Sequence, residues 1–175
     1  MLEIRPAIFD DYAAIASLHA DNWRNTYRGI LSDQYLEQEV EADRHETWRQ
    51  RMQNPNLNQR VIVAEIERKI VGFSCLLLND DPVFGSLVDN LHVASNAQNA
   101  GLGKRLLQQT ASIVLEQSSV RQMYLWVYEQ NSHARSFYDR MLGHHFETVI
   151  KENESGNRVP VCRYTWEDAA ILASR

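Results

Sequence analysis

Apolar residues alternate with polar ones in some segments of this chain and recur every three or four residues in others. Alternation is typical of β-strands, and the longer period is typical of helices that bury one face. The alternating segments predict strands at residues 2–5, 60–67, 70–78, 87–94, 122–128, 145–151 and 158–165. The periodic segments predict a helix capped by Asp10 and Asp11, with Ile15, Leu18 and Trp23 on its apolar side, and helices at residues 34–52, 99–117 and 131–141.

These elements follow one another in the order β-α-α-β-β-β-α-β-α-β-β. Arg68-Lys69 is the expected link of a central hairpin, residues 79–85 are an expected loop, and residues 152–157 join a last hairpin. We therefore expect an α+β fold, with one mostly antiparallel sheet of about seven strands and helices on both faces. The chain has no repeat or linker-like stretch, so we expect residues 1–175 to form a single domain.

Charge and composition exclude several classes of protein. The formal net charge is -5, which disfavours binding to nucleic acid or to an anionic membrane. No apolar run approaches the roughly 20 residues of a membrane-spanning helix, and the N-terminal segment with Glu3 does not resemble a secretory signal. Cys75 and Cys162 are predicted to be core thiols of a cytoplasmic protein. His144-His145 has no further ligand at metal-binding spacing, so we expect no metal.

The most informative segment runs from the predicted strand at 87–94 into the predicted helix at 99–117. Gly101 and Gly103 lie in the first turn of that helix, where free backbone N–H groups and the helix dipole attract anions. A glycine there removes the Cβ that would hold a phosphate away, at a cost of about 1 kcal/mol relative to alanine. The pattern therefore predicts a phosphate cradle.

The spacing of the glycines distinguishes three kinds of phosphate-binding motif. A dinucleotide fingerprint requires glycine where the chain has Leu106, and a nucleotide P-loop requires glycine where it has Gln98. The chain therefore matches neither nucleotide-binding motif. The pattern Gln98-x-x-Gly101-x-Gly103, followed by a basic residue, resembles instead the acyl-CoA pyrophosphate loop of the GNAT superfamily of N-acetyltransferases.

A second segment carries the same resemblance. After the strand at 122–128, the pattern Asn131-x-x-Ala134-x-x-Phe137-Tyr138 is similar to the second signature of the family. Asn131, Ala134 and Tyr138 share one helix face. The resemblance implies that Asn131 hydrogen-bonds the pantetheine chain, that Ala134 leaves room for it, and that Tyr138 protonates the departing thiolate. The family glycine after this helix comes one residue later here, at Gly143, so we expect a different turn.

The resemblance covers residues 2–166 and implies a GNAT-like fold that takes acetyl-CoA as co-substrate and an amine as acceptor. The residues that it assigns to the cofactor are Leu91, His92, Val93, Gln98, Asn99, Ala100, Gly101, Leu102, Gly103, Lys104, Asn131, Ala134, Phe137 and Tyr138. A backbone N–H near Val93 is the implied donor to the developing oxyanion. A non-catalytic acyl-CoA sensor of the same fold is the alternative, and monomer and homodimer are both open.

The sequence identifies the catalytic base and the acceptor-binding residues less clearly than the cofactor motifs. Asp89, Glu129 or an ordered water are the candidates for the base. Asn90 and His92 are expected on the opposite strand face from Asp89, and His92 is expected to be structural.

Trp23, Tyr27 and Arg28, with Glu129, are expected to line the acceptor side. Residues 1–50 hold 5 basic and 10 acidic residues, which favours a cationic acceptor. Arg24 and Arg28 favour a carboxylate-bearing one, and both classes remain open.

Overall fold

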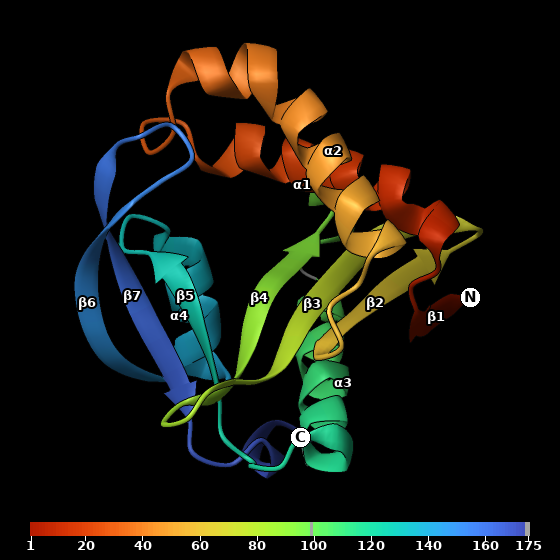
Figure 1. Cartoon of the computed structure of the whole chain (residues 1–175), viewed down its shortest axis with the longest axis vertical. Helices are drawn as coiled ribbons and strands as arrows, with labels where there is room; N and C mark the ends of the chain where they lie inside the picture. Colours follow the sequence, from red (N-terminus) through yellow and green to blue (C-terminus); the bar gives the residue numbers. More distant parts are fainter. Residues whose placement is uncertain (99, 174–175) are drawn as a thin grey trace.

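The computed structural model describes residues 1–98 and 100–173, and its centre is a seven-stranded sheet of order β1-β2-β3-β4-β5-β7-β6 (Figure 1). The strands are β1 (Leu2–Pro6), β2 (Gln59–Ile66), β3 (Lys69–Asp81), β4 (Gly85–Val93), β5 (Met123–Tyr128), β6 (His144–Glu152) and β7 (Arg158–Trp166). Neighbouring strands are antiparallel except for β4 and β5, which are parallel. The predicted α+β fold with a mostly antiparallel sheet is confirmed.

Helices cover both faces of the sheet. They are α1 (Tyr12–Thr26), α2 (Val40–Gln53), α3 (Leu102–Gln117), α4 (Ser132–Arg140) and the short α5 (Ala170–Ala173). Ile15 of α1 is buried in one apolar cluster with Cys75 of β3, whereas Leu107 of α3 and Tyr138 of α4 are buried in another with Leu76. Successive strand residues point to opposite faces, so α1 lies on one face and α3 and α4 on the other. No helix in the described part of the chain is long and apolar enough to span a membrane.

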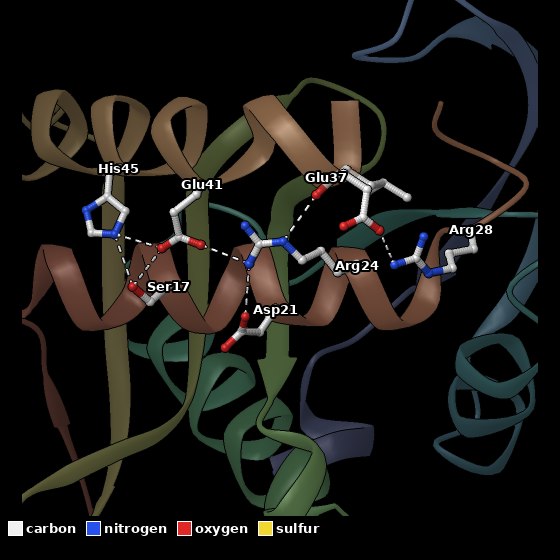
Figure 2. Close-up of polar contacts among 8 residues, drawn as sticks. Ser17, Asp21, Arg24, Arg28, Glu37, Glu41 and His45 are labelled. Atoms are coloured by element: carbon white, nitrogen blue, oxygen red, sulfur yellow. Dashed lines mark hydrogen bonds and ion pairs between the residues drawn. The ribbon is translucent and has the colours of Figure 1, made fainter. Parts of the chain in front are cut away.

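Polar contacts fasten α1 to α2, which buries only Val40 and Trp48 among its own residues. Figure 2 shows Glu41 of α2 between two residues of α1. Ser17 Oγ donates to Glu41 Oε1 at 3.1 Å, and Arg24 Nη1 pairs with Glu41 Oε2 at 2.9 Å. The α1–α2 layer therefore depends on charged contacts as well as on apolar burial.

Three local expectations differ from the structure. Asp11 caps the 3₁₀ turn Phe9–Asp11 by accepting from Ile8 N at 2.8 Å, and makes no side-chain cap on α1. Its carboxylate also pairs with Arg5, which explains why it is not free to cap α1.

The link between β2 and β3 and the loop before β4 also differ from their predicted positions. The two-residue link between β2 and β3 is Glu67-Arg68 rather than Arg68-Lys69, and both residues have positive φ, 50° and 64°. Such angles match the turn that joins twisted strands most tightly. The expected loop at 79–85 is shorter, because β3 continues to Asp81.

The turn after α4 explains the displaced glycine. Leu142 adopts φ 61°, and Gly143 N donates to Tyr138 O at 2.9 Å while Leu142 N donates to Asp139 O at 3.0 Å. This is the double hydrogen bond of a Schellman helix end, with leucine at the left-handed position that usually holds glycine. A Cβ on Gly143 would lie 2.8 Å from Trp166 Cζ2, so close packing requires the glycine at its later place.

We predict that Leu142→Gly stabilises the protein. A left-handed residue other than glycine costs about 1–2 kcal/mol, part of which the more flexible unfolded chain offsets, so the expected gain is about 0.5–1 kcal/mol. Thermal unfolding measures it. Ser136→Gly, at an exposed position within α4, is the matched control and should destabilise by roughly 0.5 kcal/mol. Equal destabilisation by both glycines would show that the left-handed turn carries no strain.

Candidate functional site

The site is built where β4 and β5 separate. The two strands pair only at Ser86 with Met123 and at Leu87 with Tyr124, and then run apart (Figure 1). Their other edges pair with β3 and β7. Beyond the paired residues, the facing edges of β4 and β5 have no strand partner in the described part of the chain. Their N–H and C=O groups are thus available to a ligand that can pair with a strand edge.

A cleft of about 780 Å³ occupies this position, bounded by both strands, the starts of α3 and α4, and the end of α1. Twelve of the predicted cofactor-binding residues line it: Leu91, His92, Val93, Gln98, Gly101, Leu102, Gly103, Lys104, Asn131, Ala134, Phe137 and Tyr138. Ala100 is not among the lining residues, and Asn99 lies outside the described residues. The two motifs, separated along the chain, therefore meet in one cleft.

The start of α3 presents unbonded backbone N–H groups at this cleft. The first intrahelical bond runs from Arg105 N to Gly101 O at 3.1 Å, so the N–H groups of residues 101–104 have no partner in the helix. Gly101 needs its glycine for the backbone, since φ is 75°. A Cβ on Gly103 would lie 3.6 Å from Phe137 Cζ and 3.8 Å from Val93 Cγ2, an ordinary contact distance. The arrangement can hold an anion at the helix N-terminus.

Asn131 begins α4 and is already engaged within the protein. Its Oδ1 accepts from Ala134 N at 3.1 Å, which caps the helix. A hydrogen bond also joins it to Tyr27. The residue therefore positions α4 and α1 relative to one another at the wall of the cleft.

Tyr138 is a neutral phenol in the cleft wall. Its side chain is 8% exposed and its ring packs 5.8 Å from Tyr164 and 6.2 Å from Trp166, centroid to centroid. Burial raises the pKa of Tyr138 above its ordinary value, and nearby Tyr27 adds to the effect. Within residues 1–98 and 100–173 its hydroxyl has no hydrogen-bond partner. This group can donate a proton to an atom in the cleft.

Asp89 lies in a β-bulge of β4. Cys75 of β3 faces Asn90, but the next residue, Leu76, faces Val88, so Asp89 is the extra residue. The expectation that Asp89 and Asn90 point to opposite faces is wrong, because the bulge interrupts the alternation. Asn90 Nδ2 donates to Asp89 Oδ2 at 2.6 Å, and Arg51 Nη1 contacts the same oxygen at 2.6 Å. All three residues of this stretch, Asp89, Asn90 and His92, line the cleft.

A second cleft of about 240 Å³ adjoins the first. The residues shared by the two clefts are Tyr27, Asp89, Asn90, His92, Trp126 and Val127. The remaining walls of the second cleft come from Trp23, Tyr128, Lys151, Glu152, Glu154 and Val161. The shared residues mark a junction at which ligands in the two clefts would meet.

The turn between β6 and β7 forms part of the wall of the second cleft. Asn153 Nδ2 donates to Ile30 O at 2.9 Å, and Ser32 N donates to Ser155 Oγ at 2.9 Å, so the turn is fastened to the loop after α1. This contact brings Glu154 to Tyr128, whose hydroxyl donates to Glu154 Oε2 at 3.1 Å.

Tyr27 lies beside Tyr128 in the wall of the second cleft. The two rings are edge-on, with 4.9 Å between their centroids. Burial and the charge of Glu154 raise the pKa of Tyr27 to about 12, so this phenol is neutral as well. The second cleft thus combines aromatic faces with carboxylates.

The four predicted acceptor-side residues separate into two groups. Tyr27 lines both clefts, and Trp23 reaches the second although only 7% of it is exposed. Arg28 and Glu129 line neither cleft. Figure 2 shows Arg28 directed at Glu37, with which it pairs. Glu129 is exposed just after β5.

Sequence reasoning missed Trp126, Tyr128 and Glu154, which line the second cleft. The alternation of aromatic residues along β5 was a usable signal for the first two. Glu154 gave no local signal, because it reaches the cleft only through the fastened turn.

Comparisons with known proteins agree with this geometry. A family model described as "Acetyltransferase (GNAT) family" matches residues 16–144. The uncharacterized N-acetyltransferase YuaI of Bacillus subtilis is 28% identical over 177 residues, covering 98% of this chain and 96% of the relative. The probable N-acetyltransferase Rv2775 of Mycobacterium tuberculosis is 29% identical over 145 residues, covering 79% and 78%.

Solved structures share the fold. The PaiA N-acetyltransferase of Thermoplasma acidophilum, in complex with coenzyme A, superposes with a TM-score of 0.71 at 20% identity, over 95% of this chain and 99% of that one. The family match covers well over half of the chain. This protein is a member of the GNAT family of acetyltransferases.

Proposed function

We propose that this protein transfers an acetyl group from acetyl-CoA, bound in the larger cleft, to a primary amine that enters through the smaller one. The separation of β4 and β5, with the glycine-bearing start of α3 at the cleft, is the observation that carries the proposal. PaiA, a structural neighbour of the same fold, holds coenzyme A.

The donor would be held mainly by backbone groups. Its pyrophosphate would accept from the N–H groups of residues 101–104, with the helix dipole and Lys104 adding positive potential. The amides of its pantetheine chain would pair with the free edges of β4 and β5, as an added strand would. Acetyl-CoA is the co-substrate in this account.

Chemistry would take place at the junction of the clefts. The neutral amine nitrogen attacks the thioester carbonyl carbon, the C–N bond forms, the nitrogen loses its second proton to water, and the C–S bond then breaks. Tyr138 would give its hydroxyl proton to the departing thiolate and recover one from solvent. Its neutral state at pH 7, which burial enforces, suits a general acid.

The acceptor must lose a proton before or during attack. An alkyl ammonium with a pKa near 10.4 is only about 0.04% neutral at pH 7, a cost of about 4.6 kcal/mol. We assign its removal to Asp89 acting through water, because Asp89 lies at the junction of both clefts. Glu129 lines neither cleft and is the weaker candidate.

The smaller cleft favours a small cationic amine, or the amine-bearing end of a longer molecule. Its volume of about 240 Å³ is below the usual range for drug-sized ligands. The rings of Tyr27 and Tyr128 and the carboxylates of Glu152 and Glu154 attract a positive charge, whereas Lys151 opposes it. Arg24 and Arg28, the residues that favoured an acidic acceptor, both lie outside this cleft.

Acetyl-CoA should raise the unfolding temperature, whereas ATP and NAD should not. Ligand at 100 times its dissociation constant stabilises by about 2.7 kcal/mol, or about 5–11 °C for a chain of this size. Gly103→Val should weaken acetyl-CoA binding at least tenfold, because its methyl groups would cover the N–H groups at the helix start.

Thermal unfolding and calorimetry measure both effects. The Cβ at position 103 meets only ordinary contacts, so the fold should survive. Ser112→Val, in the same helix but outside the cleft lining, is the control. A larger shift with ATP or NAD than with acetyl-CoA would reject the proposed donor.

Tyr138→Phe should lower kcat by about 10²–10⁴-fold if it acts as the general acid, with little change in acetyl-CoA affinity. Thiol release in a screen of small amines measures the rate. Tyr164→Phe is the matched control, because this neighbouring tyrosine is buried but lines neither cleft. Equal rates for wild type and Tyr138→Phe would rule out the assigned acid.

A further inference from the structure

His92 of β4 lies at the junction of the two clefts and lines both of them. Its ring packs 5.3 Å from Phe73 and 4.4 Å from His19, measured between centroids. The sequence interpretation made it a structural residue, but this position brings a further polar group, besides Tyr27, Asp89 and Asn90, to the point where donor and acceptor would meet.

Asn22 of α1 determines which nitrogen of His92 carries the proton. Asn22 Nδ2 donates to Val93 O at 3.0 Å, which identifies that atom as the amide nitrogen. The same nitrogen lies 3.5 Å from His92 Nδ1. Because an amide nitrogen can only donate, His92 Nδ1 must accept, and the neutral ring then carries its proton on Nε2.

The surroundings of His92 keep the ring neutral. Burial, together with the charge of Arg44, lowers the pKa of His92 to about 4. His19, whose ring packs against that of His92, is neutral too: burial lowers its pKa, and its Nδ1 accepts from Trp48 Nε1 at 2.9 Å. Asp89, across the junction, is paired with Arg51. At pH 7 His92 is therefore a hydrogen-bond donor and a poor base.

The donor atom of His92 opens to the cleft. Among residues 1–98 and 100–173, His92 Nε2 has no hydrogen-bond partner. It is nevertheless not one of the buried unpaired polar atoms, unlike Nε2 of His19. A group that is neither bonded to protein nor sealed from solvent, on a residue that lines both clefts, faces the space that ligands would occupy.

We propose that His92 Nε2–H donates a hydrogen bond to the acetyl carbonyl oxygen of the bound donor, and that Asn22 is the positioning residue that holds His92 in the required tautomer. This inference rests on the proposed acetyl transfer. When the amine nitrogen bonds to the carbonyl carbon, the π electron pair moves to oxygen, and Nε2–H stabilises the resulting oxyanion. The nitrogen gives its extra proton to water, the oxyanion collapses, the C–S bond breaks, and Tyr138 protonates the thiolate. His92 keeps its proton throughout.

Substitutions at His92 distinguish the effect of losing the N–H group from the effect of losing the imidazole ring. His92→Leu removes the hydrogen bond and should lower kcat by about 10²–10³-fold, the usual effect of losing one oxyanion donor. His92→Gln keeps an N–H at similar reach and should recover at least a tenth of the wild-type kcat. The dissociation constant for acetyl-CoA should change less than threefold in either variant. A His92→Leu enzyme with wild-type kcat would overturn the proposal.

Asn22→Asp tests the tautomer directly. A carboxylate cannot donate to Nδ1 and would accept from it, so the ring proton should move from Nε2 to Nδ1. Nitrogen-15 NMR of histidine-labelled protein reports which ring nitrogen is protonated. Asn25→Asp, three residues along the same helix and exposed, adds the same charge and should leave the tautomer unchanged. A wild-type His92 protonated on Nδ1 would contradict the assignment.

Infrared spectroscopy of bound, carbonyl-labelled [1-¹³C]acetyl-CoA detects the proposed hydrogen bond, and the measurement requires no amine substrate. The carbonyl stretch of bound donor should lie at lower frequency in wild type and His92→Gln than in His92→Leu. An identical stretch in all three would overturn the inference while leaving acetyl transfer intact. Failure of wild type to bind acetyl-CoA would instead reject the proposed function, and this inference with it.

Discussion

The separation of β4 and β5 after two paired residues is the constraint on which the site depends. It leaves two strand edges without partners inside the sheet, a state that is costly unless solvent or a ligand supplies hydrogen bonds. The start of α3 and the start of α4 border the same cleft. In our account, acetyl-CoA acts as the missing strand, with its phosphates at Gly101–Lys104, which explains why two motifs 30 residues apart serve one ligand.

Burial in the clefts keeps two phenols and one imidazole uncharged. It raises the pKa values of Tyr27 and Tyr138 and lowers that of His92, so all three are donors at neutral pH. Donors suit a reaction that creates negative charge first on oxygen and then on sulfur. They do not suit removal of a proton from the incoming ammonium. In our proposal that task falls to Asp89 and water, where the two clefts meet.

Local patterns in the sequence predicted the strands, the helices and the glycine-bearing start of α3, because periodicity and glycine spacing express short-range geometry. The motif at Asn131–Tyr138 was found by its resemblance to a family signature. The bulge at Asp89 was not predicted, because the adjacent apolar residues Leu87 and Val88 conceal the point where the alternation changes phase. Arg28, which was expected to line the acceptor side, pairs with Glu37 and lines neither cleft. Glu154 reaches the second cleft through the bond between Asn153 and Ile30, 123 residues apart. Contacts of that range follow from the fold and leave no local pattern.

Backbone amide NMR during titration with acetyl-CoA tests the central claim most directly. The account predicts that the largest shifts fall on amides of the α3 start and of the diverging parts of β4 and β5, from residues 88–93, 101–104 and 125–128. The outer strands β1 and β6 should be unaffected. Saturable shifts confined to other parts of the sheet, with these amides unchanged, would contradict it.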